Sequence, residues 1–211
     1  MKYRAVIFDL DGVICSTDRY HYCAWKEISR ELGVDFNEKI NNRLRGIGRL
    51  ESLEIILETY PGKLSEETKK YYAEKKNSLY RQLITKMSPA DLSSEVKTTL
   101  ERVKAKGLKI AIGSSSKNTK LILRQLGLND YFDAVSDGTN ISRSKPDPEV
   151  FIKASEYLGI EPRYCLVVED AKAGVEAALS AGMDCAAIGE AAGYESATYK
   201  LKTLSDLLLY I

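Results

Sequence analysis

The sequence lacks the features that mark several classes of protein. Its 211 residues contain one histidine, one tryptophan and four cysteines, with no Cys-x-x-Cys pair. The cysteines are Cys15, Cys23, Cys165 and Cys185. Their wide separation argues against a zinc site and a disulfide framework, so we expect free thiols in a reducing compartment. Residues 1–8 turn acidic at Asp9, which leaves an apolar stretch too short for a signal peptide or membrane span, so we expect a cytoplasmic protein.

Neither sign of charge is in excess. The chain has 31 Lys and Arg residues against 30 Asp and Glu residues, a formal net charge of +1. A polyanion such as DNA, or an anionic membrane, is therefore not indicated as a partner. We expect a small-molecule partner and a monomer, with no nucleic-acid or membrane partner. The chain is long enough to bury a hydrophobic core without an external staple.

Four short apolar runs have the length and composition of buried parallel strands. They are Ala5–Phe8, Lys109–Ile112, Cys165–Val168 and Cys185–Ile188. Helical patterns that end at a glycine lie between the later strands. These patterns are Glu95–Lys106, Asn118–Leu126, Glu149–Leu158 and Ala171–Ala181. The alternation predicts βαβ units, and hence an α/β fold with a doubly wound, Rossmann-like parallel sheet.

One long segment, from Thr17 to Met87, interrupts this alternation with helical periodicity and no convincing strand. We predict three helices in it, with Ser65 as the N-cap of the last. They are His21–Leu32, Arg49–Tyr60 and Glu66–Lys86. The sequence therefore predicts an α/β core formed by residues 1–16 and 88–211, and a helical cap domain inserted at residues 17–87.

Two aspartates directly follow the first predicted strand, in Phe8-Asp9-Leu10-Asp11-Gly12. Alternation along a strand places Asp9 and Asp11 on the same side at its carboxyl end, where open α/β sheets bind ligands. Carboxylates this close repel each other, and magnesium relieves the repulsion because it prefers oxygen ligands. Taken alone, the same motif is also typical of an acidic turn.

Three other predicted strand ends supply complementary groups. Gly113-Ser114-Ser115-Ser116-Lys117 leads into a helix, whose first backbone N–H groups bind phosphate. Lys145 offers a cation in a loop stiffened by prolines, and Glu169-Asp170 adds a second acidic pair. Separately, these are also typical of a helix N-cap, a solvated lysine and an acidic helix start. Together, at the ends of parallel strands, they indicate a magnesium-dependent phosphoryl-transfer site.

The four motifs resemble those of the haloacid dehalogenase superfamily of phosphotransferases, in which a helical cap is inserted after the first motif. The resemblance implies that Asp9 is a nucleophile that forms an aspartyl phosphate and that Asp11 is the general acid/base. It implies magnesium ligands at Asp9, the main-chain oxygen of Asp11, Glu169 and Asp170. It implies phosphate-binding residues at Ser114, Ser115 and Lys145.

Three cap segments are similar to phosphosugar-binding members of that superfamily. They are Tyr20-His21-x-x-Ala24-Trp25-Lys26, Arg45-Gly46-Ile47-Gly48-Arg49 and Lys75-Lys76-Asn77. The resemblance implies substrate-binding residues at His21, Trp25, Arg45, Gly46, Arg49, Ser52, Lys76, Ser116, Lys117 and Asn118. Tyr72, Lys76, Leu79 and Leu83 lie at helical spacing, which turns Lys76 inward.

Residue types alone leave ordinary alternatives open for the cap. A lone histidine such as His21 is often structural, and a lone tryptophan such as Trp25 is often part of a core. Arg49 also suits a charged helix start. Lys76 also suits a side chain that extends toward solvent.

The resemblance implies a mutase that interconverts β-glucose 1-phosphate and glucose 6-phosphate through β-glucose 1,6-bisphosphate. The alternative is a magnesium-dependent sugar-phosphate phosphatase, in which water takes the phosphoryl group from Asp9. A phospho-aspartate signalling receiver domain also uses an aspartyl phosphate. A receiver domain, however, would be a compact sheet without the long insertion between Asp11 and Pro89.

Overall fold

A computed structural model describes residues 2–44 and 47–211. The chain divides into two compact units, one formed by Met1–Ser16 and Met87–Ile211 and the other by Thr17–Lys86. The division predicted from the sequence differs from this by one residue. Met87, which the prediction placed in the cap, belongs to the first unit, where its side chain is buried.

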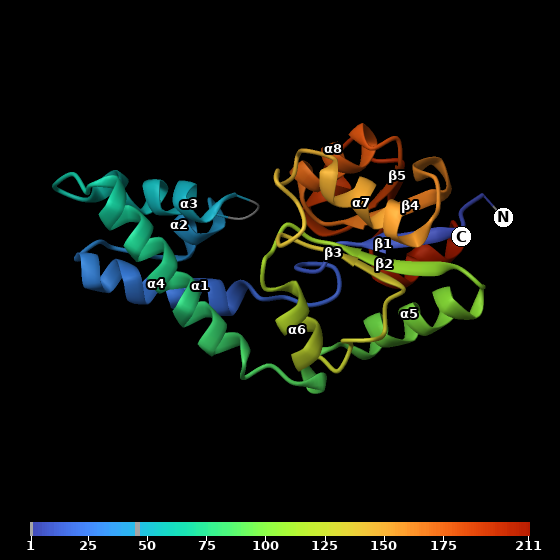
Figure 1. Cartoon of the computed structure of the whole chain (residues 1–211), viewed down its shortest axis with the longest axis horizontal. Helices are drawn as coiled ribbons and strands as arrows, with labels where there is room; N and C mark the ends of the chain where they lie inside the picture. The colour runs from blue at the N-terminus through green and yellow to red at the C-terminus, as the bar shows by residue number, and fades with distance from the viewer. Residues whose placement is uncertain (1, 45–46) are drawn as a thin grey trace. The chain divides into compact units, whose positions relative to one another are not determined.

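The first unit contains a six-stranded parallel sheet with the strand order β3-β2-β1-β4-β5-β6 (Figure 1). The strands are β1 (Ala5–Phe8), β2 (Lys109–Gly113), β3 (Ala134–Ser136), β4 (Cys165–Glu169), β5 (Asp184–Ala187) and β6 (Tyr199–Lys200). This order confirms the predicted doubly wound α/β fold. It also places the switch point between β1 and β4, where such sheets bind ligands.

Helices cover both faces of this sheet. The helices of the first unit are α5 (Ser94–Ala105), α6 (Thr119–Gln125), α7 (Glu149–Leu158) and α8 (Lys172–Ser180). α7 and α8 pack on one face, and α5 packs with the short 3-10 segment Leu204–Leu209 on the other (Figure 1). Alternate strand residues such as Ile7 and Val167 point to the α7–α8 face, where they join Phe151 and Val175 in one buried cluster.

The predicted elements of the first unit match the structure closely where the pattern is long. The four predicted helices begin and end within one residue of α5, α6, α7 and α8. The predicted strand Cys185–Ile188 is shifted by one residue, because the pairing with β4 begins at Asp184. β3 and β6 were not predicted, because with three and two residues they are too short to show a period.

The second unit is helical throughout. It contains α1 (Asp18–Leu32), α2 (Glu38–Asn42), α3 (Arg49–Ile56), the 3-10 segment Leu57–Thr59 and α4 (Glu66–Ile84). The predicted helix Arg49–Tyr60 was too long, since its last turn is the 3-10 segment, and the five-residue α2 was not predicted. The Ser65 side chain accepts a hydrogen bond from the backbone N–H of Thr68 and so caps α4, as predicted.

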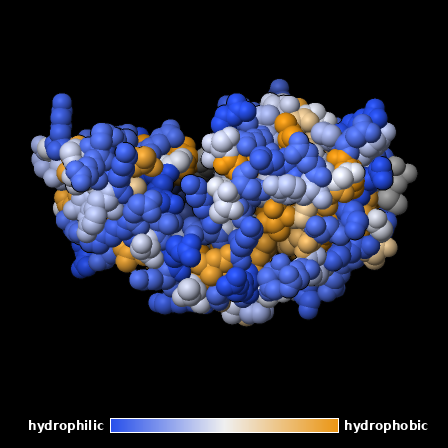
Figure 2. Space-filling view, viewed as in Figure 1, coloured by the Kyte–Doolittle hydropathy of each residue, from blue (hydrophilic) through white to orange (hydrophobic). Residues whose placement is uncertain are grey.

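Hydrophilic side chains dominate the visible surface, with apolar side chains in small patches (Figure 2). All four cysteines are free thiols, as predicted, and Cys23 alone among them is exposed. None of the helices in the described residues is long and apolar enough to cross a membrane.

Candidate active site

The buried side chain of Lys145 joins two of the predicted strand ends. Its ammonium Nζ lies 2.5 Å from Asp9 Oδ1 and 2.6 Å from Glu169 Oε1. Asp9 follows β1 and Glu169 ends β4, so the ammonium group sits across the switch point of the sheet. The Phe151 ring lies beneath it, with its centroid 4.6 Å from Nζ. An ammonium group over an aromatic face is held by the negative charge density of the ring.

Negative charge exceeds positive charge around this ammonium group. Burial raises the pKa of Asp9 to about 8; Lys145 opposes the rise, while Glu169 and Asp170 add to it. Burial also raises the pKa of Asp170 to about 7, with Glu169 and Asp11 adding to the effect. Burial lowers the pKa of Lys145, but the nearby Asp9 and Glu169 carboxylates outweigh it and raise the pKa overall. The site therefore favours a further cation.

The surroundings of Asp170 fit a magnesium ion. Gly12 has a φ of +98°, and a Cβ on it would lie 1.9 Å from Asp170 Oδ2, so the missing Cβ lets this carboxylate approach the turn that carries Asp11. No group of three His, Cys, Asp or Glu residues among the described residues forms a candidate metal site. Magnesium needs no such group, because it binds one or two carboxylates and keeps several water ligands. Asp9 and Asp170, with the main-chain oxygen of Asp11, are the groups that would hold it. Both carboxylate oxygens of Glu169, which was also predicted as a ligand, instead accept hydrogen bonds from Lys145 Nζ and the backbone N–H of Ala171.

The serine loop after β2 is tied to the lysine loop. Ser115 Oγ accepts a hydrogen bond of 3.2 Å from the backbone N–H of Lys145. Ser114 is buried, and its Oγ accepts from the backbone N–H of Ser116. Ser116 Oγ accepts from the backbone N–H of Asn118, whose side chain is also buried. The predicted phosphate-binding residues Ser114, Ser115 and Lys145 thus belong to one connected group, whereas the predicted substrate residue Lys117 is exposed.

Within the second unit, Lys76 and His21 form a close pair. Lys76 Nζ lies 2.6 Å from His21 Nδ1 and 4.9 Å from the ring centroids of both Trp25 and Tyr80. An ammonium group only donates hydrogen bonds, so Nδ1 is the acceptor and the ring carries its proton on Nε2. Burial lowers the pKa of His21 well below its ordinary value, and the charges of Lys76 and Arg49 lower it further. His21 is therefore neutral at pH 7 and offers an N–H donor.

The other predicted cap residues have different surroundings. Lys76 lies on the buried face of α4, as its spacing predicted, but its buried neighbours on that face are Ala73, Tyr80 and Ile84. Trp25 packs in the core of the second unit, which supports the core-packing alternative. Arg49 Nη1 forms an ion pair of 2.8 Å with Glu74. The remaining three residues are Ser52, which is buried in α3, and Arg45 and Gly46, which lie outside the described residues.

Two aromatic residues that contact these groups were not predicted from the sequence. The Phe151 ring lies under Lys145, and the Tyr80 ring contacts His21 with ring centroids 4.1 Å apart and planes tilted by 31°. Tyr80 also donates a hydrogen bond to Thr17 Oγ1. Neither residue carries a sequence signal beyond that of an apolar position in a helix.

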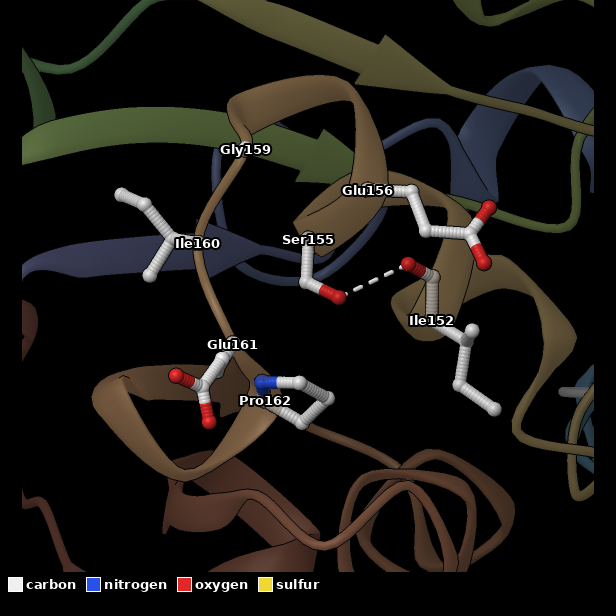
Figure 3. A pocket seen from close by; sticks show the side chains of 7 residues that line it. All are labelled: Ile152, Ser155, Glu156, Gly159, Ile160, Glu161 and Pro162. Atoms are coloured by element: carbon white, nitrogen blue, oxygen red, sulfur yellow. Dashed lines mark hydrogen bonds between the residues drawn. The ribbon is translucent and has the colours of Figure 1, made fainter.

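A surface hollow of about 320 Å³ lies away from these groups (Figure 3). It is lined by Ile152, Ser155, Glu156, Gly159, Ile160, Glu161 and Pro162. These residues end α7 and precede β4, so the hollow lies at the amino edge of the sheet, opposite the strand ends that carry the site. Ser155 Oγ donates to the main-chain oxygen of Ile152 there, as Figure 3 shows, and its lining includes no cation.

Replacement of Asp170 by Asn should stabilise the metal-free protein at high pH. The raised pKa of Asp170 means that the folded state holds its proton more tightly than the unfolded state, whose pKa is near 3.8. Stability is therefore lost as the pH rises from about 4 to about 7, and the amide avoids that loss. In excess chelator at pH 8 we expect a gain of roughly 2 kcal/mol, or a Tm higher by about 4 to 8 °C.

The gain should shrink as the pH falls below about 7, because the folded protein then holds the proton on Asp170 and no longer buries its charge. Thermal unfolding at several pH values measures the effect. The exposed residue Asp35 provides the control, since Asp35→Asn should change Tm little. A variant Asp170→Asn no more stable than the parent at pH 8 would contradict this account of the charges.

Replacement of Lys76 by Met should raise the pKa of His21. The positive charge of Lys76 is one cause of the lowered pKa, and methionine fills similar space without charge. Because the folded-state pKa is below the unfolded value near 6.5, protonation of His21 costs stability as the pH falls through that value. As the pH falls, Lys76→Met should therefore lose less stability than the parent protein.

An NMR titration measures the His21 pKa directly, because it is the chain's only histidine. Lys75→Met is the matched control, since the neighbouring Lys75 is paired with Glu31 instead. An unchanged His21 pKa in Lys76→Met would show that the two side chains do not interact as described.

Comparison with known proteins gives the family. A family model described as haloacid dehalogenase-like hydrolase matches residues 6–188. The β-phosphoglucomutase of Bacillus subtilis (strain 168) is 40% identical over 209 residues, which cover 98% of this chain and 92% of that relative. A phosphorylated carbohydrates phosphatase of Thermotoga maritima is 36% identical over 183 residues, covering 85% of this chain and 82% of the relative.

Comparison with solved structures leads to the same group of proteins. The crystal structure of β-phosphoglucomutase from Clostridium difficile matches with a TM-score of 0.86 and 37% identity, over 97% of this chain and 93% of that chain. The matches cover the sequence of both units and include a mutase and a phosphatase. The chain belongs to the haloacid dehalogenase-like hydrolase family.

Proposed function

We propose that the protein is a phosphosugar mutase that interconverts β-glucose 1-phosphate and glucose 6-phosphate through β-glucose 1,6-bisphosphate. The ammonium group of Lys145, which lies 2.5 Å from the predicted nucleophile Asp9, supports phosphoryl transfer through Asp9, and the similarity to two mutases over nearly the whole chain favours a mutase. Two of the similar proteins, from Bacillus subtilis and Clostridium difficile, bear the name β-phosphoglucomutase. Their similarity extends over nearly the whole of this chain.

The first half of the reaction transfers a phosphoryl group from Asp9 to the sugar. The 6-hydroxyl oxygen of β-glucose 1-phosphate attacks phosphorus, and the bond from phosphorus to the Asp9 carboxylate oxygen breaks. Asp11 takes the proton of the attacking hydroxyl as general base. The product is β-glucose 1,6-bisphosphate, and the Asp9 carboxylate is restored.

The second half uses the same groups in reverse after the bisphosphate turns round. Asp9 attacks the phosphorus at the 1-position, the bond to the sugar oxygen breaks, and Asp11 returns its proton to that oxygen. Lys145 and the serine loop neutralise and orient the transferring group in both halves, which is where catalysis of phosphoryl transfer is concentrated. Magnesium, when bound, would stabilise the charge that spreads over the phosphoryl oxygens.

We also propose that the helical unit binds the phosphate group that is not being transferred. Arg49 and Lys76 supply two cations in that unit, and both charges act on His21. A guanidinium fork suits a phosphate dianion, and an ammonium group adds a point charge. Arg49 would exchange its ion pair with Glu74 for the phosphate, because that carboxylate is largely exposed and its loss costs little.

The second candidate function is a sugar-phosphate phosphatase. It is favoured by the similarity to the Thermotoga maritima phosphatase, which matches over most of the chain. Asp9, Asp11, Lys145 and the serine loop would serve either reaction. The two differ only in whether a sugar hydroxyl or water receives the phosphoryl group from Asp9.

The product of the reaction decides between the two functions. The protein should convert β-glucose 1-phosphate, with magnesium and a trace of the bisphosphate, into glucose 6-phosphate at a rate about tenfold or more above release of free phosphate. Both products are measured in the same sample. Predominant release of free phosphate would contradict the mutase proposal and favour the phosphatase.

The variant Asp9→Asn tests the nucleophile in the same assay. An amide does not form the acyl phosphate, so turnover should fall by about 10³-fold or more. Asp35→Asn, at an exposed position, should retain the parent rate. Near-normal turnover by Asp9→Asn would remove Asp9 from the mechanism.

A further inference from the structure

The Glu169 carboxylate occupies a confined space. Its residue is 1% exposed, and both carboxylate oxygens are engaged. Oε1 accepts from Lys145 Nζ at 2.6 Å, and Oε2 accepts from the backbone N–H of Ala171 at 2.9 Å. These two bonds fix the carboxylate between the lysine loop and the start of α8. Glu169 is therefore, with Asp9, one of the two carboxylates that hold the Lys145 ammonium group.

A glycine in α8 leaves the room for this carboxylate. A Cβ placed on Gly174 would lie 1.9 Å from both Cδ and Oε1 of Glu169 and 2.5 Å from its Oε2. Non-bonded carbon and oxygen atoms approach no closer than about 3 Å without severe overlap. Because Cδ itself is overlapped, rotation of the carboxylate about its last bond does not relieve the clash. The whole group would have to move.

Such a movement has consequences for the nucleophile. The Glu169 carboxylate is at the end of a flexible side chain, but the residue is buried, so the carboxylate cannot rotate into solvent. Displacement would break its bond to Lys145 and so disturb the ammonium group that also contacts Asp9. Helix propensity alone would predict that Gly174→Ala stabilises α8, because alanine stabilises a helix interior better than glycine.

We propose that Gly174 is a positioning residue of the phosphoryl-transfer site. Its missing side chain creates the space in which Glu169 holds Lys145 against Asp9. The effect on catalysis rests on the proposed phosphoryl transfer, whereas the steric requirement does not. The two parts are therefore tested by different measurements.

Thermal unfolding in three backgrounds tests the steric requirement. Gly174→Ala should lower Tm in the parent and in Glu169→Gln, which keeps the size of the side chain. In Glu169→Ala, which empties the space, the same change should leave Tm unchanged or raise it. If Gly174→Ala alone does not fold, the double variant with Glu169→Ala should fold. An equal change of Tm in all three backgrounds, or failure of the double variant to fold, would overturn the proposal.

Steady-state kinetics test the positioning role. Gly174→Ala should lower kcat by about 10- to 100-fold, a range typical for loss of the partners that orient an active-site group, while KM for the sugar phosphate changes little. Gly193→Ala is the matched control, since a Cβ there meets no atom within 4 Å. Parent-like kcat in folded Gly174→Ala would refute the role. Absence of turnover in the parent would instead contradict the proposed function, and the unfolding measurements would still decide the steric requirement.

Discussion

The contact of one buried ammonium group with two carboxylates organises the rest of the site. Lys145 reaches Asp9 after β1 and Glu169 at the end of β4, and its own backbone N–H binds the serine loop after β2. Groups at the ends of β1, β2 and β4 and in the loop that carries Lys145 are thereby held in fixed positions. Loss of either partner would leave a buried charge uncompensated, which costs more than an exposed ion pair contributes. The lysine is thus a structural requirement of the site.

This contact exists because the fold brings distant strand ends together. The strand order puts β1 between β2 and β4, so residues separated by more than a hundred positions meet at one edge. Glycines then permit the close approaches that side chains would block, at Gly12 beside Asp170 and at Gly174 beside Glu169. Burial, together with the neighbouring carboxylates, raises the pKa of Asp9 and of Asp170, so a further cation would favour their ionised forms. This surplus of carboxylates is what makes the site suited to magnesium.

Much of the fold could be predicted from the sequence, and the reasons are physical. The helical pattern that ends at a glycine predicted both ends of α7 correctly. β3 and α2 were not predicted, because segments of three and five residues are too short to show a hydrophobic period. The grouping of Asp9, Glu169 and the serine loop could be predicted, because the carboxyl ends of parallel strands meet at the same edge of the sheet. The pairing of Lys76 with His21 was beyond prediction, since tertiary packing joins two helices 55 residues apart in sequence. The space at Gly174 has no sequence signal at all, because only coordinates show what a Cβ would meet.

We propose that Asp9, held by Lys145, carries the phosphoryl group as an acyl phosphate. The most direct measurement is to incubate the protein with magnesium and β-glucose 1,6-bisphosphate, quench it, and reduce acyl phosphates with borohydride before peptide mass spectrometry. Reduction of an aspartyl phosphate yields homoserine, so the account predicts homoserine at position 9 and at no other aspartate. Modification at a different residue, with Asp9 unchanged while the protein turns over, would contradict it.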